Sequence, residues 1–244
     1  MPESYAITRL LNHLFGGIVT SLLQALGIHP ANPAAPIDNT FAVELLVALG
    51  LIAFFIVVRL TLSPDKPGPA QHVAEMISEF TGGMSDQVIG HGYEKFQAWV
   101  TVIFLFILFC NLIGLIPGIP APTTSPSVPL GIAVPTFIYY HFAGFRSHGI
   151  AYLKHFAGPI WWMAWLLIPI ELVSHFARIL SLTIRLYANM YASDMLTLGF
   201  FSLVPIGVPT IFLGLHVFVS VIQAFVFMLL SMIYLSLAVS HETH

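Results

Sequence analysis

The stretch FAVELLVALGLIAFFIVVRLTL, residues 41–62, decides the fold of this chain. An apolar run of about twenty residues has the length that an α-helix needs to cross the hydrocarbon of a bilayer. Its apolar residues are continuous rather than alternating, which argues against a strand of a membrane barrel. The run ends at Ser63-Pro64, and proline disfavours the continuation of a helix. The stretch therefore predicts a membrane-spanning helix.

The composition of the whole chain agrees with this prediction. Of its 244 residues, 57% are hydrophobic and only 8% are charged, whereas soluble domains carry about 25% charged residues. Only helices and closed barrels satisfy their backbone groups in lipid, so we expect an all-α polytopic membrane protein with about five crossing helices. The net charge of -3 gives no indication of a nucleic-acid partner, and the lone Cys110 cannot form an internal disulfide.

Two segments outside the first span are expected to lie along the membrane surface. Residues 5–28 are apolar but interrupted by polar side chains, and residues 70–89 gather their apolar side chains on one helical face. Further spans are predicted at residues 96–118 and at the shorter segment 130–145. The expected organisation is an outward-facing N-terminal segment followed by one membrane domain (residues 1–40 and 41–244).

The last two apolar segments, about 158–203 and 206–240, are unusually long. At about 1.5 Å rise per residue, each would exceed the roughly 30 Å of hydrocarbon. Each is either a broken hairpin or a single, strongly tilted helix, with Pro205 and Pro209 marking the bend between the two segments. The sequence pattern leaves both alternatives open.

Basic residues gather on one side of the predicted spans, at Arg59, Lys66, Lys95, Arg146 and Lys154. The loop between the second and third spans carries no charge. Because cytoplasmic loops carry an excess of Lys and Arg, this pattern predicts an outward N-terminus and a cytoplasmic C-terminus.

Arg185 lies inside the first of the long segments, where a charge costs about 2.5–3.5 kcal/mol on insertion scales. At 100° per residue, Glu171, Arg178 and Asn189 lie within about 40° of its direction on one helix. Asp194 falls on the opposite face, about 13.5 Å further along the axis. The pattern therefore predicts that Arg185 and Asp194 point into two different environments.

On the last segment, His216 and Gln223 are seven residues apart and share a helical face. If the two long segments form an antiparallel hairpin, His216 can face Asp194. Asp and His are suited to relaying protons, and Gln223 can donate and accept hydrogen bonds. Arg185 stays protonated, so it can attract a passing carboxylate and block leakage but cannot relay a proton.

Simpler interpretations compete at several positions. Arg178 can extend its charge to the headgroups, Glu171 can cap a helix, and His216 alone can be a hydrogen-bonded core residue. We interpret Ser174 and His175 as packing or interfacial groups. The remaining histidines show no metal-ligand spacing (His13, His29, His72, His91, His141, His148, His155, His241, His244).

The segment RLYANMYASDM, residues 185–195, resembles the R-L-x-x-N-M-x-x-[small]-[acid] motif of subunit a of the F-type rotary ATP synthase. FCNLIGLIPG, residues 109–118, is similar to the N-L-x-G-L-x-P signature of that family. Residues 216–238 resemble the closing helix of the family, and the resemblance covers roughly residues 40–240.

The resemblance implies roles for individual residues. Arg185 would be the essential arginine facing the ring of c subunits, with Gln223 as its polar neighbour. Asp194 and His216 would belong to the half-channel that opens outward, and Glu171 to the half-channel that opens inward. The two long segments would then be tilted helices lying along the ring.

The resemblance further implies that Asn189 helps to line the ion path. Two departures from the family pattern stand out. The outward loop reads APTTSPSVP, with Ser125 where many relatives carry an acid, and the motif acid Asp194 is one methylene shorter than the commoner Glu.

The expected function is that of an ion-conducting stator subunit, non-catalytic by itself, in a bacterial inner membrane. Its partners would be the c-ring, the peripheral-stalk b subunits, the other ATP synthase subunits and lipid, with no cofactor or metal. A stand-alone transporter or channel is the alternative, although no internal repeat is visible. A membrane enzyme would need a nucleophile–base pair or clustered ligands, which the histidine spacing does not offer.

Overall fold

The computed structural model describes residues 5–25, 27, 35–63, 66–116, 118–149, 152, 164–203 and 207–239. Within these residues the regular structure is helical, and six helices are long and apolar enough to cross a membrane. The predicted all-α polytopic membrane fold is therefore confirmed. The six include α1 (Ala6–Ala25), which the sequence pattern predicts as a surface helix.

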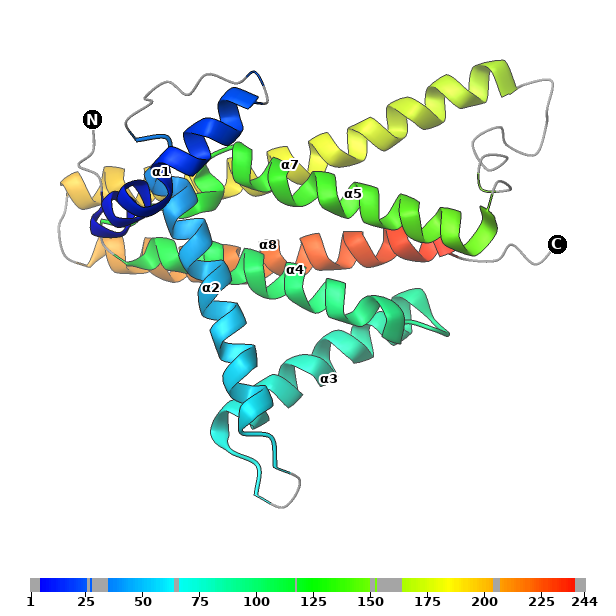
Figure 1. Cartoon of the computed structure of the whole chain (residues 1–244), viewed down its shortest axis with the longest axis horizontal. Coiled ribbons are helices and arrows are strands. Elements are labelled where there is room, and N and C mark those ends of the chain that lie inside the picture. The colour runs from blue at the N-terminus through cyan, green and yellow to red at the C-terminus, as the bar shows by residue number, and fades with distance from the viewer. Residues whose placement is uncertain are drawn as a thin grey trace.

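Helix α2 (Asn39–Leu60) is the first predicted span, and α1 and α3 adjoin its two ends. The side chain of Asp38 caps α2 by accepting a hydrogen bond from the Phe41 amide at 2.8 Å. Helix α1 lies across this end of α2, and Asn12 accepts a hydrogen bond from the Ile37 amide at 3.0 Å. Helix α3 (Pro69–Ile89) leaves the opposite end of α2 at an angle (Figure 1).

Helix α4 (Glu94–Leu112) continues into the 3-10 turn η1 (Ile113–Leu115). The chain then folds back through a second turn, η2 (Pro122–Thr124), into α5 (Ser127–His148). A Cβ added at Gly114 would lie 2.8 Å from the Cβ of Ala121. The close return of this loop onto η1 therefore depends on glycine at position 114.

Helices α7 (Ala164–Leu203) and α8 (Val208–Val239) are each continuous. They run antiparallel to each other (Figure 1), so the long segments are single helices rather than broken hairpins. The 40 residues of α7 extend for about 60 Å, twice the thickness of the hydrocarbon layer, so this helix must be strongly tilted. Several positions named in the sequence predictions lie outside the described residues. They are the beginning of the first long segment at 158–163, the bend at Pro205, residues 240–244, His29 and His155.

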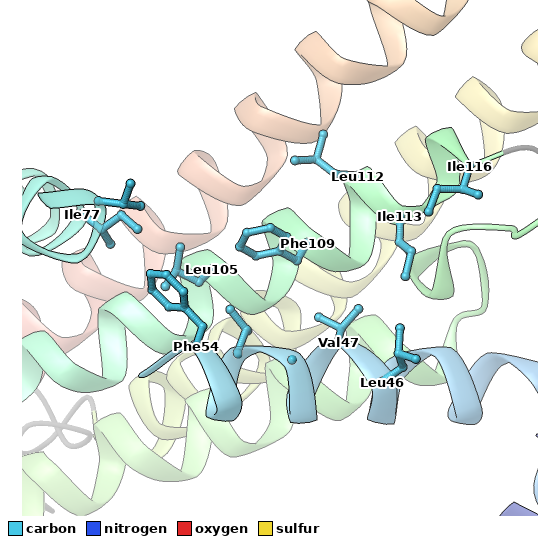
Figure 2. Close-up of a pocket in the computed structure, with 12 residues that line it drawn as sticks. Leu46, Val47, Phe54, Ile77, Leu105, Phe109, Leu112, Ile113 and Ile116 are labelled. Atoms are coloured by element: carbon cyan, nitrogen blue, oxygen red, sulfur yellow. The ribbon is translucent and has the colours of Figure 1, made fainter. Parts of the chain in front are cut away.

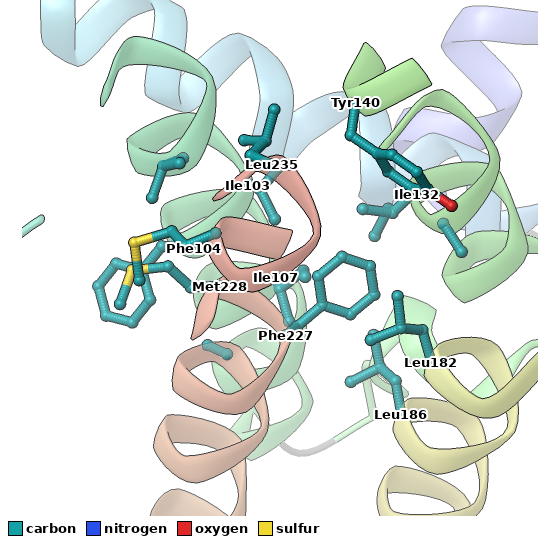
Figure 3. Close-up of a cluster of buried hydrophobic side chains, with 14 of the residues drawn as sticks. Ile103, Phe104, Ile107, Ile132, Tyr140, Leu182, Leu186, Phe227, Met228 and Leu235 are labelled. Atoms are coloured by element: carbon teal, nitrogen blue, oxygen red, sulfur yellow. The ribbon is translucent and has the colours of Figure 1, made fainter. Parts of the chain in front are cut away.

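Helices α4, α5, α7 and α8 share one apolar core, shown in Figure 3. Continuous burial on one stripe of each helix is what a membrane bundle needs, because the lipid-facing side is apolar as well. Side chains from all four helices meet there, including Ile107, Tyr140, Leu186, Phe227 and Met228. This core fixes the register of α7 against α8 and thereby positions the polar side chains of both helices.

Helix α2 diverges from α4 and leaves a groove of about 540 Å³. The walls are apolar side chains of α2, α3, α4 and η1 (Figure 2). Leu46, Val47 and Phe54 face Leu105 and Phe109 across the groove. This lining is typical of a surface at membrane depth and contributes no polar group to the site described below.

Candidate ion-conducting site

Arg185 lies on an exposed face of α7, near the middle of the helix. Its Nη2 donates a hydrogen bond to Ser181 Oγ at 3.4 Å, one turn earlier, and Asn189 is exposed one turn later. Within the described part of the chain, Arg185 has no ion-pair partner. The large side chains beside it, Leu180 and Ile184, are exposed and apolar. An unpaired guanidinium thus projects from a surface that is otherwise suited to lipid or to a membrane partner.

His216 on α8 is buried and held by three groups. Its Nε2 lies 3.2 Å from the backbone oxygen of Asn111, and its Nδ1 lies 3.0 Å from Ser193 Oγ and 3.4 Å from Asp194 Oδ1. A carbonyl oxygen only accepts hydrogen bonds, so Nε2 carries a proton. In the neutral ring Nδ1 therefore accepts from the Ser193 hydroxyl, and in the protonated ring Nδ1–H can donate to Asp194.

The polar network around His216 continues into α4 and the turn η2. Asn111 Oδ1 accepts a hydrogen bond from Thr123 at 2.7 Å, and Asn111 Nδ2 donates to the Ser220 backbone oxygen at 3.4 Å. The Asp194 carboxylate lies near the Ala121 backbone amide. The Ser220 hydroxyl is buried without a partner among the described residues. A water molecule that enters this region could therefore form a hydrogen bond with the Ser220 hydroxyl.

Glu171 stands at the centre of a second polar cluster, near the beginning of α7. Its Oε1 lies 3.3 Å from His175 Nδ1 and 3.9 Å from Arg178 Nη2. His175 Nδ1 also donates to the Glu171 backbone oxygen at 2.9 Å. The Arg178 guanidinium lies 5.1 Å from the ring centroid of Tyr234 on α8, a distance at which the ring face attracts a cation. The contacts with Glu171 and Tyr234 replace the predicted alternative in which Arg178 only reaches toward the headgroups.

Helix α5 adds a second histidine to the Glu171 cluster. The His141 and His175 rings are stacked, with centroids 4.8 Å apart and planes at 25°. His141 Nδ1 lies 2.9 Å from the hydroxyl of Tyr152, beyond the end of α5. The Tyr140 hydroxyl is buried and has no hydrogen-bond partner among the described residues. Polar groups of three helices thus meet inside an otherwise apolar bundle.

The structure brings some of the predicted site residues together and leaves others apart. It joins Asp194 to His216 across the antiparallel helices α7 and α8, as predicted for an antiparallel pair of long segments. Gln223 is buried on α8, but no hydrogen bond joins it to Arg185 within the described residues. Ser125, in the outward loop, shares a hydrogen bond with Ser127 at 2.9 Å. Nowhere in the described ranges do three His, Cys, Asp or Glu residues come together as metal ligands.

Sequence reasoning missed several polar neighbours that the structure brings into these clusters. Asn111 belongs to the N-L-x-G-L-x-P signature, and Ser193 fills the small position of the arginine motif, so both carried a recognisable signal. His141 and Tyr152 carried none, because their contacts depend on tertiary packing. His175 lies four residues after Glu171 on one helix, so its contact with Glu171 could have been predicted from that spacing.

An unpaired arginine between two carboxylate–histidine clusters, in a bundle of membrane helices, defines a protein that handles ions within the membrane. The family model described as ATP synthase A chain matches residues 41–236. ATP synthase subunit a of Koribacter versatilis is 52% identical over 242 residues, covering 99% of each chain. The subunit of the same name from Solibacter usitatus is 47% identical over 234 residues, covering 96% of this chain and 100% of the relative. The chain therefore belongs to the ATP synthase subunit a family, the proton-translocating stator subunits of F-type ATP synthases.

Proposed function

We propose that this subunit passes protons through two offset half-channels, which meet at Arg185 on the surface of a c-ring. Three observations support the proposal. Arg185 has no ion-pair partner in the described residues, Asp194 pairs with buried His216, and Glu171 pairs with His175. Glu171 and Asp194 are 23 residues apart on α7, about 35 Å along its axis, so the two clusters lie far apart along the helix.

The single observation that carries the proposal is the exposed, unpaired guanidinium of Arg185. An arginine facing plain lipid would cost about 2.5–3.5 kcal/mol on insertion scales. A membrane partner that presents a carboxylate at the same depth removes this cost and gives the arginine a function. A ring of c subunits has this chemistry, and Asn189 would line the path beside it. Peripheral-stalk b subunits and the remaining synthase subunits complete the proposed assembly.

The outward half-channel would run past Asp194 and His216. A proton arriving at Asp194 can pass to His216 Nδ1, across the 3.4 Å separation, and the ring nitrogen exchanges its Ser193 contact for Asp194 as it does so. The proton then neutralises a ring carboxylate, which can turn away from Arg185 into lipid. Gln223, buried on α8, would supply an uncharged hydrogen-bonding group.

The inward half-channel would begin where the ring carboxylate returns toward Arg185 and releases its proton in the direction of Glu171. Arg185 stabilises the carboxylate that forms and blocks a direct leak between the two routes, because its guanidinium does not release a proton. In a bacterial inner membrane this assignment places α1 and the N-terminus outside. It places α3, the α5–α7 connection and the C-terminus in the cytoplasm, as the basic residues favour.

Arg185→Ala tests this proposal in membrane vesicles that contain the complete synthase. We expect proton-driven ATP synthesis to be lost while the subunit remains inserted and assembled, because nothing then separates the two routes. Arg59→Ala, at an exposed position at the end of α2, is the matched control and should retain synthesis. Retained coupling in the Arg185→Ala membranes, or isolation of the complex without a small carboxylate-bearing ring protein, would contradict the proposal.

A further inference from the structure

His141 and His175 form an imidazole pair that neither the arginine motif nor the hairpin explains. Their rings come from different helices, α5 and α7, and are stacked with centroids 4.8 Å apart. One end of the pair contacts Glu171 through His175 Nδ1 at 3.3 Å, and the other end contacts Tyr152 through His141 Nδ1 at 2.9 Å. We propose that this pair relays protons between Glu171 and Tyr152 and so forms the cytoplasmic end of the inward half-channel.

The two nitrogens of His175 allow it to act in the relay. When Glu171 holds the proton, its carboxyl can donate to Nδ1 of the His175 tautomer that carries its proton on Nε2, and this gives a carboxylate and an imidazolium. The imidazolium then releases the Nε2 proton and is left with the proton on Nδ1. That tautomer is the one stabilised by the Glu171 backbone oxygen at 2.9 Å. One proton thus enters at Nδ1 and one leaves at Nε2.

Transfer from His175 to His141 needs a water molecule, because stacked rings do not direct their N–H bonds at each other. The buried Tyr140 hydroxyl, unpartnered within the described residues, would satisfy such a water. His141 can then take up a proton on Nε2 and release one from Nδ1 to the Tyr152 oxygen, whose own proton moves on. Burial raises the pKa of the Tyr152 phenol, so this hydroxyl passes protons without becoming an anion near neutral pH.

The charges around the pair allow it to carry a single extra proton. If both His141 and His175 were protonated, their like charges would repel at this separation. The Arg178 guanidinium, on α7 beside Glu171, would then be a third positive group. Among the described residues, Glu171 on α7 is the one carboxylate in these contacts, while α5 and α8 contribute the phenols Tyr140 and Tyr234. A second protonation is therefore disfavoured, and an arriving proton is passed on rather than stored.

The packing of Tyr152 indicates that its position is built into the fold. A Cβ added at Gly144 on α5 would lie 2.5 Å from Tyr152 Cε2, so the ring occupies space that only glycine leaves open. The Phe145 ring also contacts Tyr152 edge-on, with centroids 4.9 Å apart. Glycine at position 144 therefore holds the phenol within reach of His141.

The inference rests on the proposed role of Glu171, and the experiment separates the two. We would prepare inverted membrane vesicles with the complete synthase, remove the catalytic sector, and measure passive proton flow between about pH 5 and 9. His175→Gln and His141→Gln should lower the flow about tenfold or more and change its pH dependence, because proton transfer by a positioned base contributes at least that much. His91→Gln, exposed in a turn between α3 and α4, is the matched control and should behave like the wild type.

Two further variants test the end of the relay. Tyr152→Phe removes only the hydroxyl and should lower proton flow about two- to tenfold, the range expected for one lost hydrogen bond. Gly144→Ala should reproduce the Tyr152→Phe phenotype because it displaces the ring, whereas Gly131→Ala, with open space around it on the same helix, should not.

The possible results distinguish the relay from the route that it serves. If Glu171→Gln blocks the flow while both histidine variants conduct with the wild-type rate and pH dependence, the relay is wrong and the inward route stands. If His141→Phe, which preserves an aromatic ring in the stack, conducts normally, the pair has only a packing role and the inference is overturned. If Glu171→Gln conducts normally, the proposed inward route itself fails.

Discussion

The two carboxylate–histidine clusters of α7 differ in how they are held. Asp194 meets a histidine from α8, whose side chain is only 2% exposed. Glu171 meets a histidine one turn away on its own helix, and the side chain of Glu171 is 35% exposed. The first pair is thus a tertiary contact that exists only when the hairpin closes, whereas the second is a local helical contact that tertiary packing extends.

The difference extends to the neighbouring groups. Apart from Asp194, the groups around His216 are small polar side chains and a backbone atom, from Ser193, Asn111 and indirectly Thr123. Around Glu171 the neighbours are aromatic rings and a guanidinium, and Arg178 lies over Tyr234. The Asp194 cluster therefore stabilises one defined proton position, while the Glu171 cluster surrounds its acid with histidine rings and a permanent cation.

This comparison suggests that, under the proposed mechanism, one cluster delivers protons to the ring and the other receives them. A group that delivers protons to a ring carboxylate should hold them in a defined position close to the ring. A group that receives protons should be held where it can pass them on, and a nearby permanent cation can position a carboxylate in this way. The position of Arg178, beside Glu171 and far along α7 from Asp194, fits that requirement.

Asp194→Asn should produce the largest effect. The substitution keeps the shape of the side chain but removes the acid that faces His216, and positioned acid–base groups contribute about 10²–10⁴-fold to rates. We expect proton-driven ATP synthesis in vesicles to fall at least about 10²-fold, with normal amounts of assembled complex. Glu79→Gln, which neutralises an exposed acid on α3, is the control. Comparable loss in the control, or activity above about one tenth in Asp194→Asn, would remove Asp194 from the outward route.

Gly114→Ala should have an intermediate effect that is confined to the His216 cluster. The added methyl group would press on Ala121, whose neighbours Thr123 and Asp194 belong to that network. Overpacking of this kind typically costs about 1–3 kcal/mol. If the overpacking destabilises the conducting arrangement by this amount, proton flow should fall roughly tenfold, since about 1.4 kcal/mol corresponds to a factor of ten.

Gly50→Ala is the control for this prediction, because a Cβ at position 50 on α2 meets nothing within 4 Å. It should be neutral or slightly stabilising, as alanine favours a helix over glycine. Thermal unfolding of the detergent-solubilised complex and proton flow in vesicles measure both effects. Equal behaviour of the two variants would show that the close return of the loop does not support the site.

The sequence predicted the elements of the fold well because membrane spans are long and uniformly apolar. The continuous runs indicated α2, α4, α5, α7 and α8, and the amphipathic pattern indicated α3. The pattern left open whether the long segments bend, because a tilted helix and a broken hairpin have the same composition. The packing of α4 and α5 against the α7–α8 hairpin decided that question.

The site was predictable only in part, for a related reason. Residues on one helix can be placed by 100° steps, which correctly put Arg178 on the side of Glu171. Contacts between helices depend on rotation and register, which no periodicity determines. His175 therefore looked like a packing residue until His141 from α5 was found stacked on it. Pairs of isolated polar residues on different spans deserve more weight in membrane sequences than their spacing suggests, because each must find a partner.

The smallest predicted effect concerns Tyr234, which lies under the Arg178 guanidinium. Tyr234→Leu removes the attraction between cation and ring, worth roughly 0.5–1 kcal/mol at sites that water can reach. Arg178 should then hold Glu171 less firmly, and passive proton flow should fall about two- to fivefold. Tyr234→Phe retains the ring face and should stay within about twofold of the wild type.

These two variants sharpen the contrast between the clusters because neither touches the His216 network. If the guanidinium positions Glu171 for proton release on the cytoplasmic side, the Leu variant should conduct more slowly than the Phe variant. Measuring flow in inverted vesicles across a range of outside pH tests this, since that face is then accessible. Identical profiles for the Leu and Phe variants would show that Tyr234 only packs against Arg178. In that case the cation acts on Glu171 through their 3.9 Å contact alone.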